Sequence, residues 1–194
     1  MRTFKINEIF YSLQGEGFYT GTPSIFIRFS GCNLDCPFCD TDHSEGQTLT
    51  EPEIMEEVEK YPSQHVVLTG GEPSLYIDRE FIQSLHSLGK FVAVETNGTC
   101  PLPDNVDWVT LSPKFDVQPD AAVTLSECDE LKVVYRRQDM GIYSRIAARH
   151  HFIQPCDTGD KKLDRQLLSE SVEFCKEHPH WRLSLQTHKF IGIQ

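Results

Sequence analysis

The sequence is organised around residues 28–41, which read Arg28-Phe-Ser-Gly-Cys32-Asn-Leu-Asp-Cys36-Pro-Phe-Cys39-Asp-Thr41. Three cysteines follow one another in the spacing C-x3-C-x2-C, so a single loop can turn all three sulfurs toward one point. Residues 24–30 are apolar and rich in aromatic and β-branched side chains, which predicts a short strand. We therefore expect the cysteines on a loop at the carboxyl end of that strand.

Three thiols of this kind can hold a metal centre, and the residues alone leave two kinds open. A structural zinc ion takes four closed ligands, and Cys32, Cys36, Cys39 and His43 would supply a Cys3His set. An iron–sulfur cluster held by three cysteines leaves one iron open to an outside ligand. A disulfide framework is disfavoured, because the chain has seven cysteines, an odd number, and they are widely scattered.

The composition describes an ordinary globular chain. With 194 residues, 39% apolar and 24% charged, it fits one domain over residues 1–194 with a full core. The net charge of −11 disfavours a nucleic-acid partner, since phosphate backbones are bound by clustered Lys and Arg. No apolar run reaches membrane-spanning length, and residues 1–5 are not followed by an apolar signal region. We expect a cytoplasmic protein with no membrane partner.

Strand and helix signals mostly alternate along the chain. We expect strands over residues 6–10, 24–30, 65–69, 90–95, 108–112, 130–135, 151–154 and 181–186. We expect helices over residues 50–60 (opened by a Thr50–Glu53 capping box), 78–88, 138–149 and 163–177, the last with Leu163, Leu167, Val172 and Phe174 toward the core. Residues 99–107 are too short for a helical crossover. The alternation favours an α/β fold with a parallel sheet and outer helices.

Polar and glycine residues follow these strands, where the active sites of barrel-like α/β folds form. They are Cys32, Gly71, Glu72, Asn97, Ser112, Lys114, Gln154 and His188. The turn at residues 70–73, Gly-Gly-Glu-Pro, exposes backbone groups and adds a carboxylate that can pair with an ammonium. Each such residue alone also fits an ordinary turn, so the prediction of a site rests on their coincidence.

Two further patterns suit a small anionic ligand. Arg28 lies within an apolar strand and needs an anion, either a ligand or a nearby Asp or Glu. The oxygen donors of residues 40–43 either bind Mg²⁺ or form a solvated turn.

The cysteine spacing and the Gly-Gly-Glu-Pro turn together resemble the radical S-adenosylmethionine (SAM) superfamily. In that superfamily the open iron of a 4Fe-4S cluster binds SAM, whose reductive cleavage gives a 5′-deoxyadenosyl radical. Further motifs narrow the resemblance to the 7-carboxy-7-deazaguanine synthase family: residues 13–17 (LQGEG), the Arg28 strand, 39–41 (CDT), 69–73 (TGGEP), 95–98 (ETNG), 112–114 (SPK), 153–155 (IQP) and 185–189 (LQTHK).

This resemblance implies a shortened (β/α)6-type partial barrel, usually dimeric. It implies a lyase that converts 6-carboxy-5,6,7,8-tetrahydropterin to 7-carboxy-7-deazaguanine, a precursor of queuosine, with loss of ammonia. Hydrogen abstraction at C6 by the deoxyadenosyl radical would start a ring contraction assisted by Mg²⁺. No catalytic residues beyond the cofactor ligands are implied.

The resemblance also implies a role for individual residues. Cys32, Cys36 and Cys39 would hold the cluster, and Thr41 would hold Mg²⁺. SAM would be bound by Gly71, Glu72, Ser112, Pro113, Lys114, Gln154, Pro155, Cys156 and Asp157. The pterin would be bound by Leu13, Gln14, Gly15, Glu16, Arg28, Thr69, His188 and Gln194, with Arg28 on its carboxylate. Cys100, Cys128 and Cys175 receive no ligand role, and we expect Cys175 to pack on a helix.

The implied partners are a second copy of the chain and a flavodoxin or ferredoxin as electron donor. Residues 42–64 leave room for only a loop and one helix, a shortening that we expect to affect how the donor docks. Two alternatives remain open at this point: an activase for a glycyl-radical enzyme and a non-catalytic zinc module. The activase shares the cysteine loop and the Gly-Gly-Glu-Pro turn, whereas the motifs at residues 13–17 and 186–188 favour the pterin enzyme.

Overall fold

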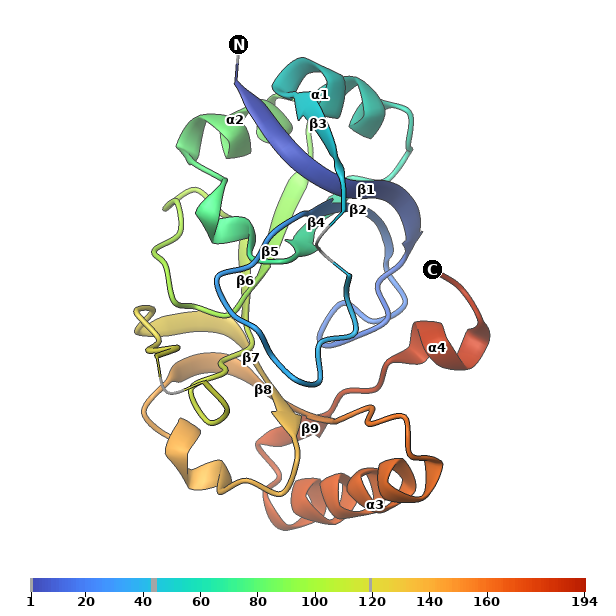
Figure 1. The fold of residues 1–194 in the computed structure, drawn as a ribbon, viewed down its shortest axis with the longest axis vertical. Helices are drawn as coiled ribbons and strands as arrows, with labels where there is room; N and C mark the ends of the chain where they lie inside the picture. Colours follow the sequence, from blue (N-terminus) through green and yellow to red (C-terminus); the bar gives the residue numbers. More distant parts are fainter. Residues whose placement is uncertain (1, 43–44, 119) are drawn as a thin grey trace.

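The computed structural model describes residues 2–42, 45–118 and 120–194. Within these ranges nine strands form one sheet in the order β3-β1-β2-β4-β5-β6-β7-β8-β9 (Figure 1). Strands β2 (Pro23–Phe29), β4 (His65–Gly70), β5 (Phe91–Thr96), β6 (Trp108–Leu111), β7 (Glu127–Tyr135), β8 (Ala147–Pro155) and β9 (Trp181–Leu183) pair in parallel. The carboxyl ends of these strands therefore lie along one edge of the sheet.

The sheet departs from the parallel prediction at its first edge. Strand β1 (Thr3–Leu13) is longer than expected and pairs antiparallel with β2. A short strand that the sequence did not predict, β3 (Gln47–Thr50), pairs antiparallel with the beginning of β1. The outer strands β3 and β9 are not neighbours in the sheet order, so the sheet is curved but open, in agreement with a partial barrel.

Helices cover the outside of the sheet at its two ends (Figure 1). Helices α1 (Glu51–Glu59) and α2 (Arg79–Ser87) pack their apolar sides on the strands around β4. Helix α3 (Lys161–Glu177) covers β8 and β9. The expected capping box is present, because the Glu53 carboxylate accepts from the backbone N–H of Thr50 at 2.7 Å.

Two expectations about helices are wrong. Residues 138–149 form only a 3-10 turn, η2 (Met140–Tyr143), and then enter β8. The reason is tertiary, because Ala147 and Ala148 pair with Glu127 and Cys128 of β7 and so extend the sheet. In α3, Leu167 is buried but Val172 is exposed, and Ser171 takes the inward position.

The remaining elements bring distant segments to the carboxyl edge of the sheet. A second 3-10 turn, η1 (Pro73–Leu75), follows the Gly-Gly-Glu-Pro turn. The short helix α4 (Thr187–Ile191) follows β9, and the chain end then runs back beside β1, where the Ser12 hydroxyl donates to the Gln194 carbonyl at 2.7 Å (Figure 1). In the described ranges, no helix is long and apolar enough to cross a membrane.

Candidate functional site

The cysteine loop is fastened to the turn after β4 by backbone hydrogen bonds. The N–H of Gly71 donates to the Phe29 carbonyl at 2.9 Å, and the N–H of Glu72 donates to the Gly31 carbonyl at 3.0 Å. A Cβ atom at Gly71 would overlap the Gly31 carbonyl oxygen, so only glycine permits this approach. The two segments that carry the superfamily resemblance are thereby brought into contact.

The carboxylate of Glu72 is turned into the protein. Its side chain is 1% exposed. It accepts from the Ser74 N–H and hydroxyl at 3.1 and 2.6 Å, from the Thr96 hydroxyl at 2.6 Å and from the Asn97 N–H at 2.7 Å. Glu72 therefore joins the turn after β4 to the end of β5, and these bonds give its carboxylate a structural role.

A cavity of about 210 Å³ opens between these loops at the carboxyl edge of the sheet. Cys32, Cys36 and Cys39 line it together. Of the residues expected to bind SAM, eight also line it: Gly71, Glu72, Ser112, Lys114, Gln154, Pro155, Cys156 and Asp157. Pro113, between two lining residues, does not. We call this space the cofactor-side cavity.

The three cysteines of this cavity are of the kind that holds an iron–sulfur cluster. Burial raises the pKa of the Cys32 and Cys36 thiols, and each is raised further by charge on neighbouring cysteines, so the sulfurs lie near one another. Within the described ranges no three His, Cys, Asp or Glu side chains close around one metal ion. His43, the fourth ligand of the zinc alternative, lies outside the described residues. All seven cysteines are free thiols in this structure.

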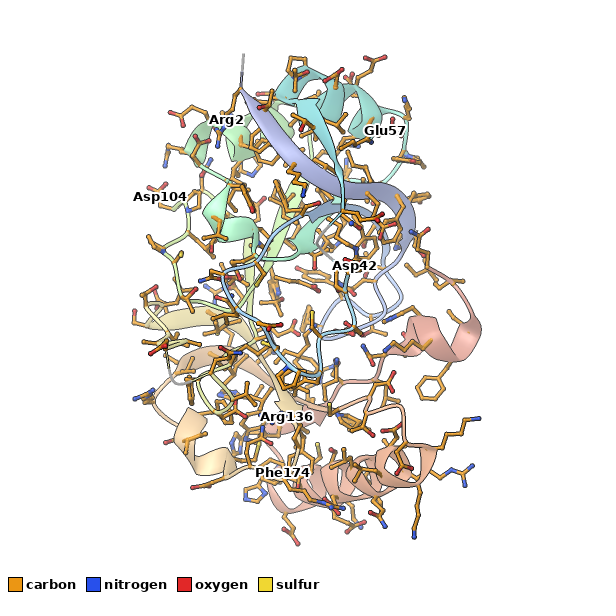
Figure 2. The ribbon with its side chains drawn as sticks, in the orientation of Figure 1. Arg2, Asp42, Glu57, Asp104, Arg136 and Phe174 are labelled. Atoms are coloured by element: carbon orange, nitrogen blue, oxygen red, sulfur yellow. The ribbon has the colours of Figure 1, made fainter. Side chains whose placement is uncertain are left out.

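Lys114 is a buried amine beside the cysteines. Its Nζ donates to the Ser112 carbonyl at 2.6 Å and to the Ser112 hydroxyl at 2.7 Å. Burial lowers its pKa below the ordinary value. Arg136, labelled in Figure 2, lies with its guanidinium 4.7 Å from the centre of the Phe38 ring, and it also pairs with Asp116. These cations lie around the cysteine loop of an otherwise acidic chain.

A second cavity, of about 560 Å³, lies between β1, β2 and the chain end. All eight residues expected to bind the pterin line it: Leu13, Gln14, Gly15, Glu16, Arg28, Thr69, His188 and Gln194. The chain end lies against β1, where the Gln194 amide donates to Glu8 at 2.5 Å, a placement that the sequence alone did not predict. The His188 ring lies against Gly15, where a Cβ would collide with it. We call this space the substrate-side cavity.

The two cavities share a wall. Both are lined by Glu16, Asp40, Thr41, Thr69, Glu95 and Gln186. Thr41, the residue expected to hold Mg²⁺, is thus at the boundary between the cysteine loop and the substrate-side cavity. A molecule in one cavity can reach a molecule in the other across these side chains.

A polar network behind this wall was not anticipated from the sequence. Lys132 is 5% exposed and forms an ion pair with Glu16, and its Nζ lies 3.8 Å from the Glu95 carboxylate. Glu95 accepts from the Gln14 amide at 3.1 Å and from the Thr69 hydroxyl at 2.8 Å. The signal was present on β7, where Glu130 and Lys132 alternate with Leu131 and Val133 and so point to one face.

The segment after β9 ties several loops of the site together. Lys189 on α4 pairs with Asp40 at 3.0 Å and with Asp157 at 2.7 Å. The Gln186 amide donates to Glu16 at 2.9 Å and to Asp40 at 3.0 Å. Burial would raise the pKa of Asp40, but its bonds to Lys189 and Gln186 lower it below the ordinary value.

Comparison with known proteins agrees with this arrangement. Residues 26–113 match the radical SAM superfamily. The chain is 55% identical over 190 residues to 7-carboxy-7-deazaguanine synthase of Bacteroides thetaiotaomicron, covering 98% of each chain. It is 39% identical over 222 residues to the synthase of Nitratidesulfovibrio vulgaris, covering 98% of this chain and 99% of the other. The crystal structure of QueE from Escherichia coli matches with a TM-score of 0.79 and 29% identity, covering 96% of this chain and 95% of that one.

Proposed function

The chain belongs to the 7-carboxy-7-deazaguanine synthase family of radical SAM enzymes, and we propose how its two joined cavities serve that reaction. It is a radical SAM lyase that converts 6-carboxy-5,6,7,8-tetrahydropterin to 7-carboxy-7-deazaguanine with loss of ammonia. The product belongs to the queuosine pathway. A 4Fe-4S cluster and SAM are the cofactors of this superfamily.

We assign the cofactors to the cofactor-side cavity. Cys32, Cys36 and Cys39 would hold the 4Fe-4S cluster, and the other lining residues expected to contact SAM, from Gly71 to Asp157, would bind it. Once bound, these cofactors supply the one-electron chemistry that removes hydrogen from C6 of the pterin. The fixed approach of Gly71 to Gly31 would set where SAM lies relative to the cysteine loop.

We assign the pterin to the substrate-side cavity. Arg28 would pair with its carboxylate, since a guanidinium presents paired N–H donors to a carboxylate. The side chains of Gln14 and Glu16 would hydrogen-bond the ring edge, and Thr69 and His188 would border it. Thr41 on the shared wall would place Mg²⁺ beside the substrate carboxylate, where the ion would bias the ring contraction.

The shared wall is the observation that carries this assignment. The reacting carbon must meet the SAM-derived radical directly, and Glu16, Thr69 and Glu95 border both cavities. Orientation of one hydrogen against one carbon is the protein's main contribution to such a reaction. Gln194 and α4 would cover the substrate-side cavity and exclude water.

The partners are also proposals. We propose that residues 1–194 act as one domain in a cytoplasmic homodimer that receives electrons from a flavodoxin or ferredoxin. The family resemblance supports each of these. The shortened segment between the cysteine loop and β4 would then alter donor docking, and replacing it with a longer version from a relative should change the affinity for flavodoxin.

One anaerobic incubation tests the function. Reconstituted protein with SAM, reductant, Mg²⁺ and 6-carboxytetrahydropterin should yield both 5′-deoxyadenosine and 7-carboxy-7-deazaguanine by mass spectrometry, and Cys36→Ala should yield neither. Deoxyadenosine without the deazaguanine would favour the activase alternative. A colourless, oxygen-stable protein with one zinc per chain would favour the zinc module.

A further inference from the structure

We propose that Lys132 is a positioning residue that fixes the Glu16 carboxylate on the shared wall, so that Glu16 can accept N–H groups of the bound pterin. This inference rests on the proposed assignment of the substrate-side cavity. Lys132 does not line that cavity, although it does line the cofactor-side cavity, and it belonged to no motif that the sequence indicated. Its effect on the substrate would therefore pass through Glu16.

Lys132 contacts Glu16 from the side of the cofactor-side cavity, outside the cavity assigned to the substrate. Its ammonium pairs with one Glu16 oxygen, while the Gln186 amide donates to the other at 2.9 Å. The backbone N–H of Glu16 donates to the Gln14 side chain at 3.1 Å. The carboxylate is thus held by two donors and the backbone of Glu16 by a third contact, and each carboxylate oxygen keeps a lone pair for another donor.

The charges around Lys132 show why its removal would matter. The buried ammonium of Lys132 faces three carboxyl groups, those of Glu16, Glu95 and Glu130. Besides burial, its charge also lowers the pKa of Lys114, the other buried amine of the site. Burial would raise the pKa of Glu16, but Lys132 lowers it below the ordinary value. Glu130, which has an unpartnered buried oxygen among the described residues, has its pKa raised by burial. Glu16 therefore depends on Lys132 to stay ionised, against the charge of Asp40 nearby.

The ring edge of the pterin suits such an acceptor. A 2-amino-4-oxopyrimidine carries an exocyclic amine and a ring N–H side by side, and an ionised carboxylate accepts both more strongly than an amide does. A protonated Glu16 would instead present a hydroxyl donor to those N–H groups. Substrate affinity should then fall as the pH falls through the pKa of Glu16.

The test measures binding without turnover. Cluster-loaded enzyme with SAM and no reductant is titrated anaerobically with 6-carboxytetrahydropterin by calorimetry from about pH 5.5 to about pH 8.5. Lys132→Met should weaken pterin binding about tenfold or more at neutral pH, the size expected for a disturbed charged hydrogen bond. The wild-type profile should show no acid limb from Glu16 in this range, because the pKa of Glu16 is lowered below its ordinary value of 4.5. In Lys132→Met the acid limb should move to higher pH and enter the range at its lower end. SAM affinity is measured in parallel, because Lys132 also lines the cofactor-side cavity. A loss of SAM affinity as large as the loss of pterin affinity would count against an effect through Glu16.

A double-mutant cycle separates positioning from a general loss of structure. In a Glu16→Gln background, Lys132→Met should change pterin affinity less than about threefold, because the carboxylate through which it acts is gone. Lys132→Arg keeps the positive charge and should keep the acid limb near its wild-type position. Lys162→Met, at an exposed lysine of α3, serves as the control.

The outcomes are distinct. Equal losses from Lys132→Met in both backgrounds, or an unmoved acid limb, would overturn the positioning role. If Lys132→Met does not fold, the Lys132→Arg profile decides, and an acid limb moved to higher pH than in the wild type would count against the proposal, because arginine keeps the positive charge. A wild-type enzyme that binds no pterin would contradict the proposed substrate and leave Lys132 without this role.

Discussion

Glu8 and Arg28 are direct cross-strand partners on β1 and β2, and the Nε of Arg28 donates to the Glu8 carboxylate at 2.8 Å. Arg28 was expected to need an anion, either a ligand or a nearby carboxylate, and Glu8 supplies a carboxylate from within the protein. Glu8 in turn accepts from the Gln194 amide at 2.5 Å, so the chain end is coupled to the same pair. Arg28 lines the substrate-side cavity, where the rest of its guanidinium can meet a ligand.

We therefore expect Arg28→Ala to weaken pterin binding by about tenfold to a hundredfold, the range for a charged hydrogen bond that loses its partner. Slow SAM cleavage without substrate should persist, because Arg28 does not line the cofactor-side cavity. Parallel measurements of substrate KM and of uncoupled 5′-deoxyadenosine formation check both parts. Unchanged pterin affinity would show that Arg28 serves only Glu8.

Gly71→Ala should damage the cysteine loop. Its Cβ would overlap the Gly31 carbonyl, and the backbone would have to shift at a cost of about 1–3 kcal/mol. We expect less iron bound per chain after anaerobic reconstitution and a lower midpoint in denaturant unfolding. Gly141→Ala is a matched control, because the nearest atom to its Cβ is a side-chain oxygen of Asp139 at 3.1 Å. Equal iron content in the two variants would contradict the proposed contact.

His65 should make stability depend on pH. Its Nδ1 lies 2.8 Å from the Ser24 hydroxyl, while Nε2 is buried with no partner among the described residues. Burial lowers the pKa of His65 below 6.5, so the unfolded chain binds a proton more readily than the folded one. The free energy of unfolding should be full above about pH 6.5 and fall as the pH drops through the folded pKa, by about 1.4 kcal/mol per unit of depression.

Urea unfolding between about pH 5 and pH 8 measures this slope. His65→Phe removes the titration and preserves the aromatic contacts with Tyr19 and Phe91. The variant should therefore show a flatter profile across this range. An identical slope in the wild type and the variant would assign the pH dependence to other groups.

Short sequence patterns predicted correctly those features of the site that a single segment of the chain forms. The cysteine loop follows a strand, Glu53 completes the capping box of α1, and the glycine turn follows β4, each as the sequence predicts. The sequence also predicted a site at the carboxyl ends of the parallel strands, which share an edge. It did not predict the division of that site into two cavities, and the separate SAM and pterin residues came from the family resemblance. Each assigned role within those cavities stays a prediction.

Other features depended on contacts between distant segments. Residues 138–149 have a helical pattern, but their pairing with β7 outweighs that local preference. Strand β3 forms because β1 offers a free edge to residues 47–50. Lys132 can pair with Glu16 only because the loop after β1 brings Glu16 to β7, although the two residues are 116 positions apart in the sequence. Sequence periodicity could place Lys132 on the inner face, but not choose its partner.

Lys189 should couple the two cavities without adding much stability. Its ion pairs with Asp40 and Asp157 are partly exposed, and such pairs contribute at most about 1 kcal/mol each. They nevertheless join the cysteine loop and the loop after β8 to α4, whose residues His188 and Lys189 line the substrate-side cavity. Lys189→Met should leave the unfolding midpoint nearly unchanged and raise KM for both SAM and the pterin by about threefold to tenfold, since both loops lose a common anchor.

The control for Lys189 is Lys176→Met, which removes an exposed pair with Glu173 on α3, away from both cavities. It should lose as little stability as Lys189→Met and leave both KM values unchanged. If Lys189→Met raises KM for the pterin alone, α4 acts only as a cover for the substrate. If neither KM moves, the two ion pairs are surface contacts without a role in the site. A joint rise is expected because Asp40 lies on the wall that both cavities share.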